Sequence, residues 1–347
     1  MKKIFSVIAL AAACGIVQQA NAIEFNEGIF HFVTVSDEYT DVKASLVPGA
    51  TVPKDVVIPT EVVYLGTTYT VTDLDGWMFS KNETIETVKM PERLTTLGWA
   101  VFEYCTNLRS CPLPESLVYI GNYCFTGCSS LNDVVIPQNV WYIGQDAFSW
   151  GGPIADEMIL PDALTELQFN AFGGSKIKKM VFGKGLKESP QGCLAWDGAL
   201  TEVVIPHNIT TIMPYAFQGC GFSHVNVGAP EVIAVNAFES CANVTEIEVE
   251  TTTPPICVEQ SFSPDMYKAT LIVPDEECIA AYKADAVWGK FAAFRASEAG
   301  SIESVAADTT VDGKVYSMQG IKVADDIKDV TIPGIYVSGG KKIVIRR

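Results

Sequence analysis

Histidine and basic residues are scarce in this sequence. Only three of its 347 residues are histidine, and 24 Lys and Arg residues stand against 41 Asp and Glu residues. The net charge of −17 argues against nucleic-acid binding, which needs a basic face to displace phosphate counterions. It also argues against attachment to anionic lipid through a polybasic patch. Catalysis by a Ser-His-Asp or Cys-His arrangement needs a histidine beside a nucleophile, whereas His31 lies in an expected strand, and His207 and His224 fit surface positions.

Motifs for catalysis and for metal binding are also missing. There is no G-x-x-x-x-G-K-[ST] phosphate loop, and Cys124 and Cys128 have no second pair that would complete a zinc site. The run Asp325–Asp329 lacks the spacing and the final Glu of a Ca²⁺ loop. Adjacent acids such as Glu276-Glu277 do not imply two carboxylates facing each other across a cleft. The sequence therefore predicts no catalytic residue, no metal site, no cofactor and no enzyme activity.

Long apolar runs are absent beyond the N-terminus, so we expect no membrane span, which needs roughly 18 or more such residues. A positively charged start, an apolar run and the small-x-small site Ala20-Asn21-Ala22 predict a secretory signal peptide over residues 1–22. The protein is then secreted or held on the outer cell surface. A lipoprotein signal acylated at Cys14 is the alternative, and it fits less well because Ala11 stands where Leu is usual.

The main positive feature is a repeat of 21 to 24 residues with the pattern V-x-I-P-x-x-V-x-x-I-G-x-x-A-F-x-x-C-x-x-L. Val134–Phe148 shows the first part of it most completely. One such coil cannot bury its own apolar face, but a stack of coils makes a continuous core. The pattern therefore predicts a repeat solenoid that is mostly β, with irregular or short helical turns. The Phe position recurs nine times, at Phe79, Phe102, Phe125, Phe148, Phe172, Leu194 (a substitution), Phe217, Phe238 and Phe262.

Each coil can be divided by role. Over Leu131–Pro137 we expect a strand in which Val134 and Ile136 point inward and Val135 points outward, because side chains alternate along a strand. Pro137 ends that strand, since it cannot donate to a ladder. The following residues return to the core around a turn, namely Val140, Ile143, Gly144, Ala147 and Phe148.

Cysteine occupies one fixed place in four of the coils. Equivalent residues on neighbouring coils lie roughly 4.8 Å apart, which gives poor dihedral geometry for a disulfide. Ten cysteines minus Cys14 of the leader also leave an odd number, so they cannot all pair internally. We expect buried free thiols that act as small apolar fillers at Cys105, Cys128, Cys220 and Cys241.

The rest of the chain is organised around this array. Strands are expected at Ile29–Val35, Val52–Val63 and Thr68–Thr72. Asp275 is an expected N-cap of a short helix that covers the last coil together with Ile279, Tyr282, Trp288 and Phe291. The expected division is a signal peptide 1–22, an N-terminal β cap and irregular first repeat 23–75, the array 76–270, a C-terminal cap 271–295, a linker 296–312 and a small all-β tail 313–347.

The consensus I-P-x-x-V-x-x-I-G-x-x-A-F-x-x-C-x-x-L resembles the BspA-like leucine-rich repeats of bacterial secreted and surface proteins, over about residues 56–295. The resemblance implies a leucine-rich-repeat solenoid and adhesion to host matrix proteins or to other bacteria. The tail, with Tyr316–Gly320 and Gly334-Ile335-Tyr336, resembles the C-terminal secretion and sorting domains of Bacteroidetes proteins. A small accessory β-domain without a sorting role is the alternative.

Two outward columns of the strand face form the candidate site. The first is aliphatic over four consecutive coils, at Val135, Ile159, Val181 and Val204. The second is mostly charged, at Asp133, Glu157, Lys179, Glu202 and His224. An apolar strip beside an acidic column is typical of a partner site and predicts non-catalytic binding of an extracellular protein. Strand propensity alone is the alternative explanation of exposed Val and Ile.

A second hypothesis is a carbohydrate-binding accessory protein at the bacterial surface, with a glycan as its partner. Aromatic residues on the strand face would support it, but most Trp residues fall at or after turns. Trp150 and Trp196 lie in irregular turns two repeats apart, and they are expected to form a small aromatic platform.

Overall fold

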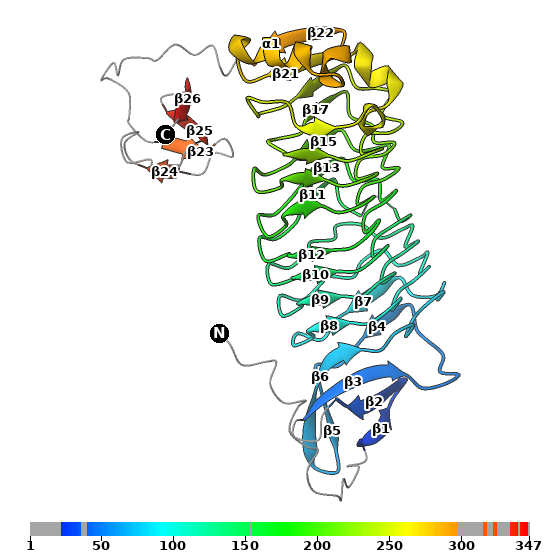
Figure 1. Ribbon diagram of the computed structural model, residues 1–347. Coiled ribbons are helices and arrows are strands. Elements are labelled where there is room, and N and C mark those ends of the chain that lie inside the picture. Colours follow the sequence, from blue (N-terminus) through cyan, green and yellow to red (C-terminus); the bar gives the residue numbers. More distant parts are fainter. Residues whose placement is uncertain are drawn as a thin grey trace, which may run out of the picture.

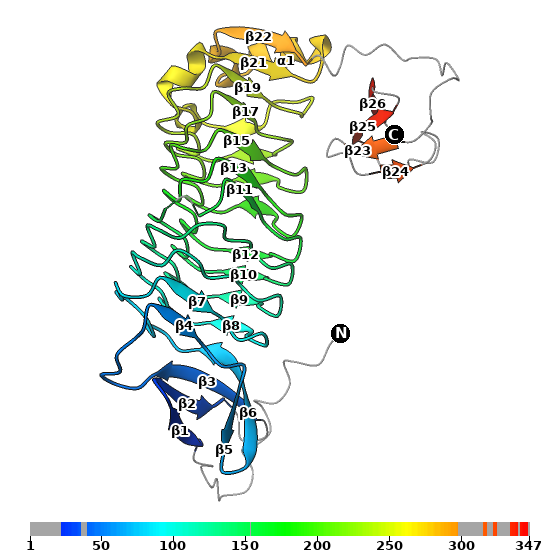
Figure 2. The ribbon, with the colours of Figure 1, turned by 180° about the vertical axis from the view of Figure 1, so that it is seen from behind.

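The computed structural model describes residues 22–35, 40–152 and 154–297, together with the backbone of four strands between residues 315 and 345. The array is a tall stack of coils whose strands run across the stack (Figures 1 and 2). Almost all of the signal peptide predicted over residues 1–22, including Cys14, and most of the linker predicted over 296–312 lie outside the described residues.

The N-terminal part is a β-sheet that continues into the array. Strands β1 (Glu24–Glu27), β2 (Phe30–Thr34) and β3 (Asp41–Leu46) are antiparallel, and β3 then runs parallel to β6 (Thr67–Leu74). The strand expected over Val52–Val63 is wrong as one element. Pro59 separates β4 (Asp55–Val57) from β5 (Glu61–Tyr64), and β5 forms a hairpin with β6.

Every coil of the array carries a segment at the V-x-I position of the pattern, and most of these segments form a short strand of a parallel sheet. This first column is divided into separate sheets. The strands are β4 with β7 (Thr87–Lys89), then β11 (Glu157–Ile159), β13 (Lys179–Val181) and β15 (Glu202–Val204), then β17 (His224–Asn226), β19 (Glu246–Glu248), β21 (Thr270–Val273) and β22 (Ala293–Ala296).

A second column of parallel strands lies at the V-x-x-I-G segment, where we expected only a return to the core. Gly144 shows why glycine follows this strand: a Cβ on it would lie 2.5 Å from the backbone nitrogen of Asn122 in the preceding coil. The two-residue strands are β8 (Thr96–Leu97), β9 (Tyr119–Ile120), β10 (Tyr142–Ile143), β12 (Glu166–Leu167), β14 (Glu188–Ser189), β16 (Thr211–Ile212), β18 (Val232–Ile233) and β20 (Ile256–Cys257).

Stacked Phe rings run through the core, and the Cys thiols follow the same ladder. From Phe79 to Phe172 the ring centroids of neighbouring coils are 5.2 to 5.3 Å apart and the rings are nearly parallel. The thiol of Cys105 donates to the carbonyl oxygen of Phe79, and that of Cys128 to Phe102. The expectation of buried free thiols is confirmed for all four repeat cysteines. Each thiol thus satisfies a carbonyl of the preceding coil.

The strand expected over Leu131–Pro137 is absent from the structure, although its pattern of burial is correct. Val134 and Ile136 are buried and Val135 is exposed, but none of the three belongs to a strand. In a regular coil the N–H of Val88 donates to Ser110 of the next coil. The N–H of Val134 donates instead to Ile154, 2.8 Å away, which lies three residues before β11. The longer turn before β11 therefore interrupts the ladder.

A short helix closes the C-terminal end of the array. Helix α1 (Glu276–Ala284) starts at Asp275, whose side chain accepts a hydrogen bond from the N–H of Cys278 at 3.0 Å, so the predicted N-cap is confirmed. Tyr282, Trp288 and Phe291 are buried in the cap. Three 3-10 helices complete it, η1 (Glu259–Ser261), η2 (Pro264–Lys268) and η3 (Trp288–Lys290).

The tail contains a four-stranded antiparallel sheet in the order β24-β23-β25-β26. Its β content is therefore as expected from the sequence. The strands are β23 (Val315–Ser317), β24 (Lys322–Ala324), β25 (Gly334–Ser338) and β26 (Lys341–Ile345).

Candidate binding surface

The aliphatic column forms an exposed strip across three paired strands. Ile159, Val181 and Val204 are in register on β11, β13 and β15. Ile159 is 54% exposed, and the two valines are partly exposed. Val135, on the coil before β11, is 74% exposed but stands outside this sheet because of the interruption. The four side chains thus share one outward face, with a break between the first and the second.

The charged column is an ion-pair ladder over the same three strands. Lys179 Nζ lies 3.2 Å from a Glu157 carboxylate oxygen and 3.0 Å from one of Glu202. Hydrogen bonds to the Glu202 and Glu157 carboxylates raise the pKa of Lys179. Since two acids share one base, the ladder keeps a net negative charge. Asp133 is exposed on the coil before β11, in a left-handed conformation with φ of 55°.

His224 belongs to a different cluster from the one expected. It lies on β17, which is in another sheet from β15, and its ring is 3.3 Å from Glu246 and 3.7 Å from Glu248. The apolar core is continuous from β15 to β17, but the two strands belong to separate sheets. The charged column is therefore two separate groups, of which only the first lies beside the aliphatic strip.

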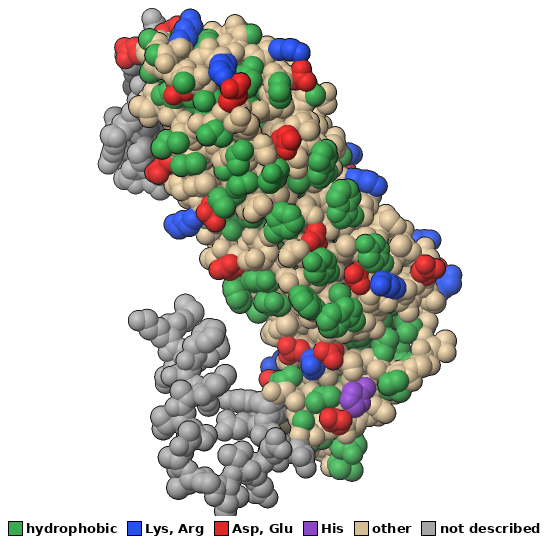
Figure 3. All heavy atoms as spheres, turned by 45° about the vertical axis from the view of Figure 1, so that its right-hand side comes forward, with side chains coloured by type: hydrophobic (Ala, Val, Ile, Leu, Met, Phe, Trp, Pro, Cys, Tyr) green, Lys and Arg blue, Asp and Glu red, His purple; other side chains and the backbone are tan. Residues whose placement is uncertain are grey.

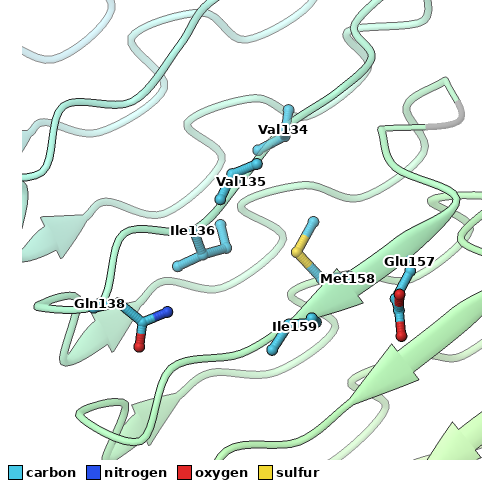
Figure 4. A pocket seen from close by; sticks show the side chains of 7 residues that line it. All are labelled: Val134, Val135, Ile136, Gln138, Glu157, Met158 and Ile159. Atoms are coloured by element: carbon cyan, nitrogen blue, oxygen red, sulfur yellow. The ribbon is translucent and has the colours of Figure 1, made fainter.

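A hollow opens where the ladder is interrupted. Figure 4 shows the side chains of Ile136, Met158 and Ile159 around it, with Gln138 at one end and Glu157 at the other. Among the described residues, no backbone hydrogen bond joins Val135 or Ile136 to β11. The hollow is lined by Val134, Val135, Ile136, Gln138, Glu157, Met158 and Ile159.

Sequence reasoning missed this hollow and the part that Ile136, Gln138 and Met158 take in it. The signal was present as a turn of unusual composition, Trp150-Gly151-Gly152, in one of the two coils whose Phe-to-Phe step is 24 residues. A longer turn shifts the register of the next coil, but the sequence does not say which hydrogen bonds are lost.

Trp150 and Trp196 lie at equivalent corners of their coils, outside both strand columns, and their side chains are exposed. Both have positive φ, 54° and 62°. The ring of Trp150 lies beside Gly174 of the next coil, and the ring of Trp196 lies beside Gly219. Each tryptophan therefore packs on a glycine backbone, and the expected aromatic platform of the two rings stays a prediction.

The other residues weighed for chemistry have structural partners. His31 Nδ1 lies 2.8 Å from the Asn26 side-chain oxygen, and His207 Nε2 lies 3.0 Å from Glu250. Within the described ranges, no three His, Cys, Asp or Glu side chains come together as a metal site would require. The helices described in this structure are all too short or too polar to cross a membrane.

Comparison with known families decides the classification. The family described as BspA type leucine rich repeat region matches residues 60–154 and 154–245, in six copies, which is more than half of the chain. The chain belongs to this family. No curated protein matches it.

Several solved structures resemble this chain, and one of them reaches a TM-score of 0.50. A leucine-rich repeat protein from Bacteroides ovatus is 17% identical, with 73% of this chain and 80% of that chain covered and a TM-score of 0.50. The T. pallidum leucine rich repeat protein is 22% identical, covering 52% of this chain and 81% of its own, with a TM-score of 0.46. A leucine rich cell surface protein from Faecalibacterium prausnitzii is 14% identical, covering 76% and 98%, with a TM-score of 0.29. The likeness to the Bacteroides ovatus protein extends to the fold alone.

Proposed function

We propose that this protein binds an extracellular protein without catalysis, through the strand face between Val135 and Val204. The observation that carries the proposal is the coincidence of the exposed aliphatic strip with a hollow at the interrupted ladder. Proteins of the leucine-rich-repeat type typically mediate protein interactions, which agrees with this use of the face.

The interruption favours a partner that presents an extended segment. β11 pairs with β13 on one side only, so its other edge faces the hollow. An added strand satisfies such an edge with main-chain hydrogen bonds, while pockets for alternate side chains supply specificity. One aliphatic side chain seated between Ile136 and Ile159 would contribute roughly 1.5–3 kcal/mol. A basic side chain beside it would meet Glu157.

In this proposal the protein acts outside the cell. Residues 1–22 would direct export, and the tail over 313–347 would serve as a sorting domain that sends the protein to the outer surface. The net negative charge is compatible with a protein that stays in solution after export. Fractionation of a Cys14→Ser variant tests the lipoprotein alternative, because only an acylated protein would leave the membrane fraction when Cys14 is replaced.

Charges placed in the aliphatic strip should weaken partner binding. In Ile159→Lys/Val204→Lys, two ammonium groups replace aliphatic contacts on the face while the inward neighbours stay in place. The mature wild-type protein is first used to capture extracellular host proteins and glycans, and the captured partner is then purified. We expect the double variant to bind that partner at least about tenfold more weakly in titration calorimetry.

Val57→Lys is the matched control, because Val57 is 63% exposed at the same outward position of β4, far from the hollow along the array. Its binding should equal that of the wild type, and all variants should melt at the same temperature. If the partner still binds to the double variant with unchanged affinity, the strip is not the binding site.

A further inference from the structure

Three exposed aromatic residues recur on every second coil. Tyr104, Trp150 and Trp196 follow one another at intervals of 46 residues, and they occupy the same corner of their coils. Their side chains are 45%, 56% and 51% exposed. The coils between and after them carry glycine at this corner, namely Gly127, Gly174 and Gly219. We call the three aromatic residues the aromatic row.

Each ring of the aromatic row is seated on the glycine of the next coil. A Cβ placed on Gly174 would lie 2.9 Å from Cε3 of Trp150, and one on Gly219 would lie 2.7 Å from Cε3 of Trp196. A Cβ placed on Gly127 would likewise collide with the ring of Tyr104. Any other residue at these glycines would displace the ring. The glycines therefore hold the rings in a fixed orientation, which lowers the entropy lost when a ligand binds.

The fold does not need aromatic residues at this corner. The corner is left-handed in every one of these coils, with φ of 53° at Tyr104, 54° at Trp150 and 62° at Trp196. Other coils fill this corner with Lys81, Ser240 or glycine, so an aromatic side chain is not required there. The exposed faces of the rings point to a ligand.

The spacing of the row suits a periodic ligand. Neighbouring coils of a stacked β array are roughly 4.8 Å apart, so rings on every second coil are about 10 Å apart. Two sugar rings of an extended β-1,4-linked chain span a similar length. Each aromatic ring would then meet the face of every second sugar, where axial C–H bonds stack on an aromatic surface. Figure 3 shows that groups of hydrophobic side chains recur along one face of the array.

The surroundings of the row favour a neutral ligand. Thr106, Asn107, Ser129 and Ser130 stand between Tyr104 and Trp150 in the sequence, and all four are exposed or partly exposed. Such hydroxyl and amide groups hydrogen-bond to sugar hydroxyls without adding charge. In the chain segments around the corners of these coils, the charged side chains are few, namely Glu103, Asp146, Lys176 and the buried Asp197. This side contrasts with the ion-pair ladder of the strand face.

We propose that the aromatic row binds a neutral, extended β-1,4-linked glycan, with one ring for each pair of sugars. None of the three residues belongs to the strand columns, and the inference does not depend on the proposed protein partner. It uses rings from three alternate coils, Tyr104 included, rather than the two tryptophans alone. No bond is made or broken in the glycan.

The test uses the mature full-length protein and cello- and chito-oligosaccharides of two, four and six sugars, with binding measured by titration calorimetry. Affinity should rise at each step up to the hexasaccharide, because only that length reaches all three rings. Trp150→Ala and Trp196→Ala should each weaken hexasaccharide binding about tenfold. Tyr104→Ala should remove the gain from tetrasaccharide to hexasaccharide.

Trp141→Ala is the matched control, since Trp141 is also exposed but lies outside the row. Its hexasaccharide affinity should be that of the wild type, and an equal loss in this variant would overturn the proposal. So would the absence of hexasaccharide binding, or binding of a polyproline peptide in its place, since extended proline helices also dock on aromatic rows. Ile159→Lys/Val204→Lys should bind the hexasaccharide normally, which separates this site from the strand face.

Discussion

Asp197 is a buried carboxylate whose surroundings are set by the corner of one coil. Its oxygens accept hydrogen bonds from the Ser175 hydroxyl at 3.0 Å, the Ile177 N–H at 3.0 Å and the Ala199 N–H at 3.2 Å. Burial raises its pKa from 3.8 to about 6, although these hydrogen bonds act in the opposite direction. The loss of hydration therefore outweighs the hydrogen bonds.

The raised pKa of Asp197 should make stability depend on pH. The folded state binds the proton more tightly than the unfolded state, so the contribution is fully present below pH 3.8 and is lost as pH rises through about 6. The loss is at most about 3 kcal/mol. In Asp197→Asn this part of the pH dependence should disappear. Urea unfolding of both proteins at pH 4 and pH 7 measures it, and an unchanged difference between the two pH values would contradict the assignment.

At the scale of one coil, two substitutions compensate each other in volume. Leu194 takes the place of the ladder Phe, and in the same coil Phe182 takes the inward place that Ile136 and Ile205 hold elsewhere. The Phe182 ring lies edge-on to Phe217 of the next coil, with centroids 6.4 Å apart. A large residue on one wall and a small one on the other thus keep the core filled.

This exchange predicts strong coupling between the two positions. Leu194→Phe alone should overpack the coil and cost about 1–3 kcal/mol. Phe182→Ile alone should leave a cavity and also destabilise the protein. The double variant should be more stable than the sum of the two changes predicts, with a coupling energy of about 0.5–3 kcal/mol. Denaturant unfolding of the four proteins measures the cycle, with Leu194→Met as a near-neutral control; additivity would show that the two sites are independent.

The whole molecule depends on its closed ends, because each coil contacts only its neighbours. At the C-terminal end, the Trp288 indole donates to the Pro255 carbonyl at 2.8 Å, and its ring packs on Phe262 with centroids 5.1 Å apart. The Tyr282 hydroxyl donates to the Thr251 carbonyl at 2.9 Å. These contacts tie the cap to the last coil and shield the core.

Removing a contact of the C-terminal cap should destabilise the array mainly at its C-terminal end. Trp288→Ala deletes a fully buried side chain and should cost about 3–5 kcal/mol. Hydrogen exchange followed by mass spectrometry should show the largest loss of protection in β19 to β22 and a smaller loss toward β7. Trp141→Ala, at an exposed tryptophan, serves as the control and should leave exchange unchanged. A uniform increase along the array would mean that the coils unfold together.

Several features of the molecule followed from the sequence alone. The period of the repeat predicted the solenoid, the buried Phe and Cys positions and the outward direction of Ile159 and Val204. These are properties of a single coil, since alternation along a strand and burial of the apolar side depend on residues that are neighbours in sequence. The N-cap at Asp275 was predictable for the same reason.

Only the tertiary structure decided where coils pair and where they do not. The second strand column, the missing strand at Val134–Ile136 and the hollow beside β11 all depend on hydrogen bonds between residues 20 or more positions apart. Their register changes with the length of each turn, and one longer turn near Trp150 moved the acceptor of Val134 to Ile154. Likewise Tyr104 joins Trp150 and Trp196 in one row because the stacking of coils brings each ring onto a glycine of the next coil. The composition of a coil therefore determined its core, and contact with the neighbouring coil determined its surface.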